Sequence, residues 1–530
     1  MKQRGYVCEP APEPQISKFH STEKLRATEE DMKRTFTRIL AAFQFGLLAY
    51  RQRNRAIQRD RGDAHKELLS GLIMRSLIWR GVFAVLLLAT VPVSCAFASD
   101  VNFSVLYAFE APDPTTLASP LGSQSDTLPA LGRDGAVYGM TYDGGSYGNG
   151  VIYRFDLESR RYTVLHTFSA LDSNGNNEDG ANPGVALTRG PDDLFYGMAS
   201  FGGENGNGTI FSISATGEFT VLHTFSALDA NGHNQDGAKP LRTVVVGNDH
   251  KLYGTTRIGG QHTCVPTPTG CGVAWVMDRT GGNFQVLHQF TPNEGHAASL
   301  LQAGDGLLYG SAVWPGTSLP SGVALPSGIL FRMKPSGQDF EVLYRFSQTD
   351  ANGRNTDGAD PYEPLVETKS GVFYGAAARG GTNGSGVVFR YSLSTPDMVE
   401  IVHDFSAVNG FAGGCPAVPL TSGANSDGAC PVGRLTLGHD GALYSEADFG
   451  GRNGNGVIYR IGQDGRFEVL YTFSATDPTT GANTDGALPD NGVILGPDNS
   501  LIGIAGFGGN GSSAGFLNSG GTLYQLKLDE

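Results

Sequence analysis

Charged residues are scarce in this chain of 530 residues, at 17% of the total, and basic residues are scarcer still over most of it. Residues 1–80 hold 16 Lys and Arg against 9 Asp and Glu, which leaves 22 basic against 43 acidic residues, a net charge of −21, for the remainder. A body of that charge cannot neutralise phosphates, so we expect no nucleic-acid partner. Acidity favours solubility and, weakly, cations over anionic ligands.

Recognisable catalytic motifs are also missing. The Gly-rich stretch Gly202–Gly208 is followed by neither a helix pattern nor Lys-Ser/Thr, which argues against a phosphate-binding loop. No Ser/His/Asp spacing or nucleophile elbow occurs, so the sequence assigns no catalytic residue. The 75 glycines follow no triplet period, which excludes collagen, and they alternate with short aromatic and β-branched runs. That composition is typical of many short strands joined by tight turns.

One hydrophobic run stands near the amino terminus. Two arginines precede the apolar stretch 81–93, and Ala96-Phe97-Ala98 follows it, with Met74 directly before the whole segment. This layout predicts a signal peptide over residues 74–98 that is cleaved after Ala98. The mature protein is then expected outside the cytoplasm, in the periplasm, at the cell surface or in the medium, with no membrane span.

Residues 1–73 leave two interpretations open. Translation could start at Met74, so that the upstream sequence is never made. Alternatively, residues 1–73 form a basic, partly helical cytoplasmic tail, and the apolar run is kept as a membrane anchor. At about 18 residues, with Pro92 inside it, the run is short for a spanning helix. Cleavage is therefore the interpretation we adopt.

Cysteine is rare, and two of the six residues, Cys8 and Cys95, precede the expected cleavage site. The remaining four fall into close pairs, Cys264 with Cys271 and Cys415 with Cys430. Two short-range disulfides suit an exported protein and would hold long loops in place. Zinc would need four clustered ligands at a characteristic spacing, which the sequence lacks, so no metal ligands are assigned.

Three markers each recur seven times from residue 101 onward. The first is an apolar pair followed by His or Tyr and, two residues later, Phe; its Phe residues are 56 to 68 positions apart and are Phe109, Phe168, Phe225, Phe290, Phe346, Phe405 and Phe473. The second is a Tyr-Gly pair, degenerate in the last two copies. The third is a Gly-rich stretch followed by a short apolar strand such as VIYRF or TIFSI. Three markers with the same count predict a repeat architecture.

Each copy contains four short strand candidates, which we name A to D in chain order. Asp-Gly turns join A to B, a strong signal for tight hairpins. Four antiparallel strands repeated about every 60 residues predict an all-β fold, a seven-bladed β-propeller over residues 99–530. The first strand, 101–109, is of D type and the last is of C type. We therefore expect the N-terminal strand to complete the last blade and close the ring.

The repeat unit YGxTxxGGxxGxGxVFxLxxxGxxTVLHxF, with DGAxP between copies, resembles the GloVer (choice-of-anchor) tandem repeat of secreted bacterial proteins. The resemblance covers essentially all of residues 101–530. It implies an exported or surface protein whose relatives carry varied C-terminal anchors, and it implies no settled activity. This chain ends LYQLKLDE, without an apolar tail, so release is expected rather than anchoring.

The D-to-A connections carry an Asp/Asn/Gly pattern, as in DSNGNNEDGA from Asp172 and DANGRNTDGA from Asp350. Closely spaced side-chain oxygens beside a Gly turn are what Ca²⁺ loops use. The same residues are also the default turn formers, because Asx side chains cap their own backbone. The EF-hand spacing with its twelfth-position Glu is absent. We expect no cofactor, with Ca²⁺ as the open alternative.

Strand alternation places the B–C loops and the D–A connections on one face of the propeller, which is where the long, patterned segments fall. Positions that differ among the seven copies at that face are the candidate ligand-binding residues. They are Tyr142, Arg257, Trp314, Arg379, Glu446 and Asp448. The alternative for each is a solvated loop residue or an ion pair between blades. The repeated histidines alternate with Tyr among copies, so we interpret them as packing residues.

Three functions remain open on the sequence. The first is a noncatalytic, monomeric, exported propeller that binds an extracellular glycan or protein on the patterned face. The second is a glycan hydrolase or lyase with Glu446 and Asp448 as acid and base, although two carboxyl groups on one strand edge are closer than such chemistry usually arranges. The third is a purely structural surface protein.

Overall fold

The computed structural model describes residues 102–528, except 114, 117, 126, 185, 241, 265–268, 314–326, 409–422 and 512–518. All the secondary-structure elements within these residues are β-strands, which confirms the all-β class. No helix among them is long and apolar enough to cross a membrane. The expected signal segment, 74–98, lies outside the described residues.

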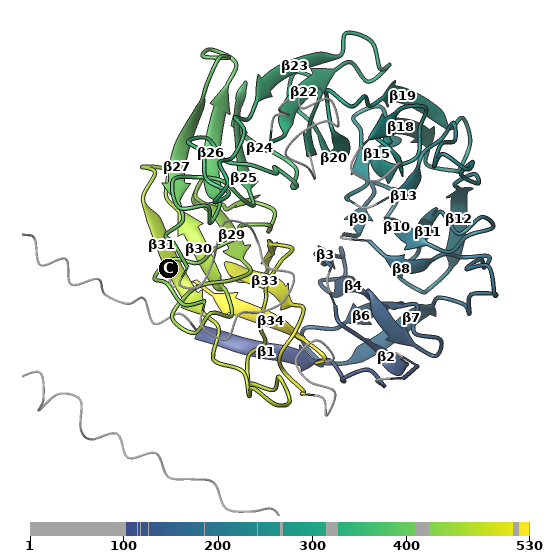
Figure 1. Ribbon diagram of the computed structural model, residues 1–530. Coiled ribbons are helices and arrows are strands. Elements are labelled where there is room, and N and C mark those ends of the chain that lie inside the picture. The colour runs from purple at the N-terminus through teal and green to yellow at the C-terminus, as the bar shows by residue number, and fades with distance from the viewer. Residues whose placement is uncertain are drawn as a thin grey trace, which may run out of the picture. The chain divides into compact units, whose positions relative to one another are not determined.

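Seven antiparallel sheets stand around a ring, each a blade whose strands run outward in the order A to D (Figure 1). Blade 1 consists of β3 (Ala130–Leu131), β4 (Val137–Thr141), β6 (Val151–Phe155) and β7 (Tyr162–Thr167). Blade 2 consists of β8 (Ala181–Pro183), β9 (Thr188–Arg189), β10 (Phe195–Phe201), β11 (Thr209–Ile213) and β12 (Phe219–Thr224). Blade 3 consists of β13 (Ala238–Pro240), β14 (Val245–Val246), β15 (Lys251–Ile258), β18 (Val273–Asp278) and β19 (Gln285–Gln289). Blades 4 and 5 are β20 (His296–Gln302), β21 (Leu308–Val313), β22 (Ile329–Met333), β23 (Glu341–Arg345); and β24 (Val366–Lys369), β25 (Val372–Ala377), β26 (Val387–Ser392), β27 (Val399–Asp404). Blades 6 and 7 are β28 (Thr436–Leu437), β29 (Leu443–Ala447), β30 (Val457–Ile461), β31 (Phe467–Thr472); and β32 (Val493–Gly496), β33 (Ser500–Ala505), β34 (Thr522–Lys527), β1 (Asn102–Ala108).

The N-terminal strand β1 is the outermost strand of the seventh blade. It pairs antiparallel with β34, from Asn102 opposite Lys527 to Ala108 opposite Thr522. Strands from the two ends of the propeller therefore share one sheet. That this pairing keeps the ring closed stays a prediction.

Strand A is less regular than the sequence suggests. In blades 2 and 3 it is divided into two short strands, β8 with β9 and β13 with β14, that pair with different parts of the same strand B. The chain adopts positive φ in front of the division, at Asn182 and Lys239. Two two-stranded sheets lie outside the blades: β2 (Ser119–Ser123) with β5 (Asp143–Gly145), and the hairpin of β16 (Thr263–Cys264) with β17 (Thr269–Gly270).

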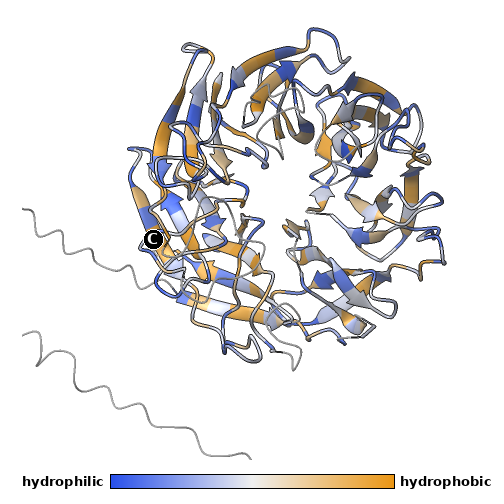
Figure 2. Ribbon diagram, in the orientation of Figure 1, coloured by the Kyte–Doolittle hydropathy of each residue, from blue (hydrophilic) through white to orange (hydrophobic). Residues whose placement is uncertain are grey.

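The core lies between neighbouring blades as well as within them. Tyr138 of blade 1 stacks on Phe195 of blade 2, with 4.2 Å between ring centroids, and Tyr309 of blade 4 packs on Phe373 of blade 5 at 4.4 Å. Figure 2 shows the hydrophobic residues concentrated along the strands and the hydrophilic ones along the loops. Each blade thus covers the apolar face of its neighbour, which is why one blade alone would not be stable.

The two faces of the ring differ. The loop face carries the B–C loops and the D–A connections, and the turn face carries the short A–B and C–D turns. On the turn face, tight turns such as Asp134-Gly135 need a residue that tolerates positive φ, and Gly135 adopts φ of 75°. The long segments all leave from the loop face, as the alternation of the strands predicts.

Candidate functional site

The Tyr-Gly pairs belong to the framework of the blades. In five copies the tyrosine hydroxyl donates to the aspartate four residues earlier, at 2.7 to 2.9 Å: Tyr138 to Asp134, Tyr196 to Asp192, Tyr253 to Asp249, Tyr309 to Asp305 and Tyr444 to Asp440. The glycine makes room for an aromatic ring of strand C. A Cβ atom on Gly254 would lie 2.4 Å from Trp275. In these five copies the pair therefore builds the blade and leaves no group for a ligand.

The repeated histidines are also structural, as the sequence predicts. In six copies the His or Tyr before the marker Phe bonds, at 2.8 to 3.1 Å, to an acidic residue of the next connection: His166 to Asp179, His223 to Asp236, His288 to Glu294, Tyr344 to Asp357, His403 to Asp427 and Tyr471 to Asp485. Burial opposes ionisation of Asp179, but hydrogen bonds from His166 and Ser169 outweigh it and lower the pKa of this carboxyl. Each histidine thus ties strand D to the connection that follows it.

The Asp/Asn side chains of the D–A connections are engaged by the backbone. The carboxylate of Asp172 accepts from the amides of Asn174 and Asn176, both at 2.8 Å, and these bonds lower its pKa. Asp229 and Asp350 form the same type of turn, and Asp477 accepts from the amides of Thr479 and Thr480 in a similar one. Among the described residues there is no group of three or more His, Cys, Asp or Glu placed to hold a metal ion. These bonds are those of the turn alternative, and Ca²⁺ binding stays a prediction.

An asparagine in each patterned connection joins that connection to a B–C loop. The amide of Asn177 donates to the carbonyls of Ser169 and Gly180, and its oxygen accepts from the amides of Gly180 and Gly203. We call this four-bond arrangement the asparagine clasp. It recurs at Asn234, Asn355, Asn425 and Asn483. The clasp holds together the two kinds of segment that form the loop face.

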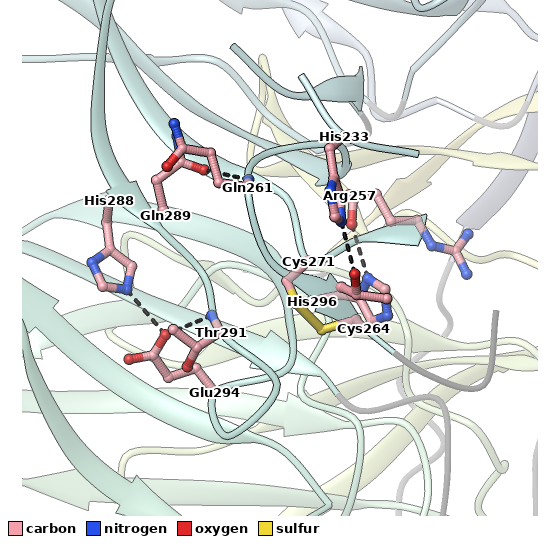
Figure 3. The surroundings of a disulfide bond; sticks show 11 residues. His233, Arg257, Gln261, Cys264, Cys271, His288, Gln289, Thr291, Glu294 and His296 are labelled. Atoms are coloured by element: carbon pink, nitrogen blue, oxygen red, sulfur yellow. Dashed lines mark hydrogen bonds and ion pairs between the residues drawn. A yellow bond between two sulfur atoms is a disulfide. The ribbon is translucent and has the colours of Figure 1, made fainter. Parts of the chain in front are cut away.

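The predicted disulfide between Cys264 and Cys271 is present, with 5.0 Å between the Cα atoms (Figure 3). Cys430 is also disulfide-bonded, whereas its expected partner, Cys415, lies outside the described residues. In the same loop region the His296 ring bonds to the carbonyl oxygen of Arg257 at 3.0 Å. Figure 3 shows the Arg257 guanidinium pointing away from the disulfide and the other groups drawn.

Glu446 lies between blades 6 and 7, and its exposed fraction is 0%. It accepts a hydrogen bond from the Gly492 amide at 2.7 Å and is also bonded to the Tyr524 hydroxyl. Burial raises the pKa of this carboxyl well above its ordinary value; the Gly492 bond opposes the rise and the charge of Asp448 adds to it. A carboxyl group enclosed in this way does not meet a ligand at the surface.

The other predicted residues fall in different places. Asp448 is half-buried two residues further along the same segment, and the half-buried Tyr142 lies in blade 1, where its carbonyl oxygen accepts from Asn182. Trp314 lies outside the described residues. The charges of Arg257 and Arg379 both act on a tyrosine that the sequence did not single out.

That tyrosine is Tyr362, which is half-buried at the start of blade 5. The Arg242 guanidinium lies 5.2 Å from its ring centroid, and Arg379 makes an ion pair with Asp360 at 3.5 Å. Burial, and then Asp360, raise the pKa of the Tyr362 phenol, while the charges of Arg379, Arg242 and Arg257 act to lower it. Arg242 thus lies over the Tyr362 ring, and the charges of Arg379 and Arg257 also act on its phenol.

An ion pair that does not involve Tyr362 adds further residues to this group of arginines. Arg242 is ion-paired with Glu363, which is only 4% exposed, and the charge of Arg434 in blade 6 also acts on Glu363. Burial raises the pKa of the Glu363 carboxyl and lowers that of Arg434, in spite of their mutual attraction. Arg242 and Glu363 are 121 residues apart in the chain. We call Arg242, Arg257, Arg379 and Arg434, with Tyr362, the arginine cluster.

The cluster has hydrogen-bond donors to spare. Nε of Arg242 is buried without a partner, and no hydrogen bond from the Arg434 guanidinium occurs within the described residues. A buried donor left unsatisfied costs about 1–3 kcal/mol. With four arginines against Asp360 and Glu363, the cluster has a local charge of +2. Its geometry and charge suit an anionic ligand.

The repeat pattern of the chain matches a known family. The Gloeobacter/Verrucomicrobia repeat matches residues 124–356 and 233–424, which together span more than half of the sequence. The chain belongs to this family. The matched residues include the strands of blades 1 to 5.

Solved structures resemble this repeat protein in fold alone. An oligogalacturonate lyase from Vibrio parahaemolyticus is 13% identical, with 81% of this chain and 97% of that one covered and a TM-score of 0.41. A gluconolactonase from Xanthomonas campestris is 12% identical over 80% and 96%, with a TM-score of 0.34. A chain of the mitotic checkpoint complex is 12% identical over 83% and 95%, with a TM-score of 0.45. Curated proteins contain no significant match.

Sequence reasoning missed Arg242, Tyr362, Glu363 and Arg434, although a signal for them exists. All four stand one to three residues after the proline of a DGAxP connection, where sibling copies of the Gloeobacter/Verrucomicrobia repeat carry Gly184 or Asn491. Comparing the copies at this position, and not only after the Tyr-Gly pair, would have found them.

Proposed function

We propose that this protein is a noncatalytic, exported binding protein that holds an acidic glycan at the arginine cluster. The observation that carries the proposal is the position of Arg242, whose Nε is buried without a partner, over the ring of the half-buried Tyr362. The charge of Arg434 acts on the neighbouring Glu363. Arginine presents a planar fork of donors that matches carboxylate and sulfate groups. A tyrosine ring offers an apolar face with a polar edge, which suits a sugar.

For a bound ligand, the positive charge of the arginine cluster counts for more than the negative net charge of the rest of the propeller. At physiological ionic strength the Debye length is about 8 Å, so exposed acidic residues elsewhere on the ring are largely screened. The arginines, in contrast, would contact the ligand directly. A disulfide in the loop region is compatible with a location outside the cytoplasm.

The proposal is tested by isothermal titration with short alginate oligomers, which carry a carboxylate on every sugar, and with neutral dextran oligomers as the comparison. Alginate is expected to bind, with an affinity that falls as salt is raised, and dextran is not. Arg434→Gln should weaken binding about 10-fold or more, because a hydrogen bond to a charged group contributes about 1.5–3 kcal/mol. Arg257→Gln should weaken it less, since that side chain is exposed.

Arg466→Gln is the matched control, because Arg466 is an exposed arginine in a turn of blade 6 on the turn face. It should leave alginate binding unchanged. Alginate that fails to bind, or that binds the Arg434 variant as well as the parent, would overturn the proposal. So would binding of poly-glutamate in place of alginate, which would identify a protein ligand.

A further inference from the structure

A pocket of about 220 Å³ lies on the turn face, between the A–B hairpin of blade 5 and blade 6. Blade 5 contributes Thr368, Lys369 and Tyr374 to its wall. Blade 6 contributes an apolar floor of Leu437, Leu443 and Ile461, together with Gln463 at the rim. The floor of the pocket is thus apolar, and its rim is polar.

Blade 5 departs from its siblings at this pocket. In blades 1, 2, 3 and 6 the A–B turn reads Gly-x-Asp, and the aspartate receives the hydroxyl of the Tyr-Gly tyrosine four residues later. A Cβ atom on Gly247 would lie 2.6 Å from the ring of Tyr253, so glycine gives the tyrosine room in these four blades. Blade 4 has the small residue Ala303 at this position, and Tyr309 still bonds to Asp305 there. Blade 5 carries Thr368 and Ser370 at these two positions.

The tyrosine of blade 5 is consequently left without its usual partner. Tyr374 is half-buried, whereas its counterpart Tyr253 is 1% exposed. No hydrogen bond from the Tyr374 hydroxyl occurs within the described residues. The nearest acidic side chain in the hairpin, Glu367, is occupied, since its two oxygens accept from the amides of Gly371 and Gly304. The Tyr374 hydroxyl is therefore available to a ligand.

Lys369 supplies the only charge among the residues that line the pocket. It is exposed and makes no ion pair within the described part of the chain. A ligand that fills this pocket would place an anionic group beside the Lys369 ammonium, a hydroxyl beside Tyr374 and an apolar body on Leu443 and Ile461. At about 220 Å³ the pocket is smaller than the 300–1,000 Å³ typical of drug-sized ligands.

We infer that this pocket binds a small organic carboxylate with a single ring, of which hydroxylated aromatic acids are the simplest examples. The ring packs on the floor from blade 6, and the carboxylate pairs with Lys369 at the rim. The site lies on the opposite face from the arginine cluster. It does not depend on the proposed function, and either can fail without the other.

The probe is 4-hydroxybenzoate, titrated against the full chain by calorimetry and by saturation-transfer NMR, with 4-hydroxybenzyl alcohol as the uncharged comparison. We expect the acid to bind and the alcohol to bind at least 5-fold more weakly. Lys369→Gln should remove that difference, because it removes the cation and keeps the shape of the side chain. Lys334→Gln, at an exposed lysine of blade 4, is the control and should change nothing.

A second variant tests the pocket itself. Thr368→Gly combined with Ser370→Asp restores the sequence of the sibling blades and should return the Tyr374 hydroxyl to the hairpin. We expect it to abolish binding of 4-hydroxybenzoate while the melting temperature stays equal or rises. The inference is overturned if the parent protein fails to bind the acid, or if the acid binds equally well to this double variant.

Discussion

At the scale of single residues, side chains that resemble catalytic or metal-binding groups turn out to satisfy the backbone. Asp172, Asn177 and His166 each complete a turn, a clasp or the end of a strand. Their residue types are those of calcium loops and active sites, because both uses depend on the same hydrogen-bonding capacity. Their repetition in several copies distinguishes them, since a framework recurs in every blade while a site is needed once.

Glu446 is the residue whose behaviour depends most on burial. Its pKa is raised in the folded protein, so the native state holds this proton more tightly than the unfolded chain does. The protonated Glu446 side chain therefore contributes fully to stability below its ordinary pKa of 4.5. This contribution is lost as the pH rises from 4.5 to the raised pKa of the folded protein. The loss can reach about 1.4 kcal/mol per pH unit.

Glu446→Gln should remove this dependence, because the amide keeps an acceptor for the Gly492 amide and supplies a donor for the Tyr524 oxygen. The free energy of unfolding of both proteins is measured in urea at pH 5 and at pH 8. At pH 8 we expect the value for the variant to exceed that of the parent by about 1 kcal/mol or more. At pH 5 the two should be closer. Glu468→Gln, on the half-exposed strand β31, is the control. A parent and variant with parallel pH profiles would contradict the prediction.

At the scale of structural elements, the asparagine clasp determines how loops are held on a blade. Asn177→Ala removes four hydrogen bonds and leaves the amides of Gly180 and Gly203 without their acceptor. At about 0.5–1.5 kcal/mol for each bond, we expect a loss of about 2–6 kcal/mol, measured by urea or thermal unfolding.

Asn174→Ala provides the matched control for the clasp. Asn174 is exposed in the same connection, and its backbone amide, which the substitution keeps, bonds to Asp172. Its effect should stay within about 0.5 kcal/mol. Equal losses for the two variants would show that the clasp does not stabilise the blade.

The elements themselves were predictable because their signals are local. A Gly-rich stretch followed by the short apolar run TIFSI predicts β11 at Thr209–Ile213, where the structure has it. Strand A was less predictable: its division into β8 and β9 depends on pairing with strand B and on a positive φ at Asn182, which alternation does not encode. Positions where one copy differs, such as Ser370 of blade 5, pointed to a site only once the neighbouring blade was known.

At the scale of the whole molecule, β1 is the element on which ring closure is predicted to depend. It covers the edge of β34, and Phe109, which follows it, is fully buried. Deleting residues 101–110 would expose that edge and remove apolar contacts from blade 7. We expect a lower melting temperature and association into oligomers, seen by light scattering, because an unpaired edge strand templates pairing.

A synthetic peptide of residues 101–110 should restore the melting temperature of the shortened chain when it is added in excess. If the shortened chain stayed monomeric and melted like the parent, β1 would not be needed to close the ring.

The sequence by itself determined the repeat, the all-β class, the seven blades and the disulfide between Cys264 and Cys271, because each of these depends on signals within one copy of about 60 residues. Only the tertiary structure decided where chemistry can occur. It brings Arg242 against Glu363 across 121 residues, encloses Glu446 between blades 6 and 7, and opens a pocket between blades 5 and 6. The physical reason is that burial and charge at these places come from neighbouring blades, and the arrangement of those blades around a ring is a property of no single repeat.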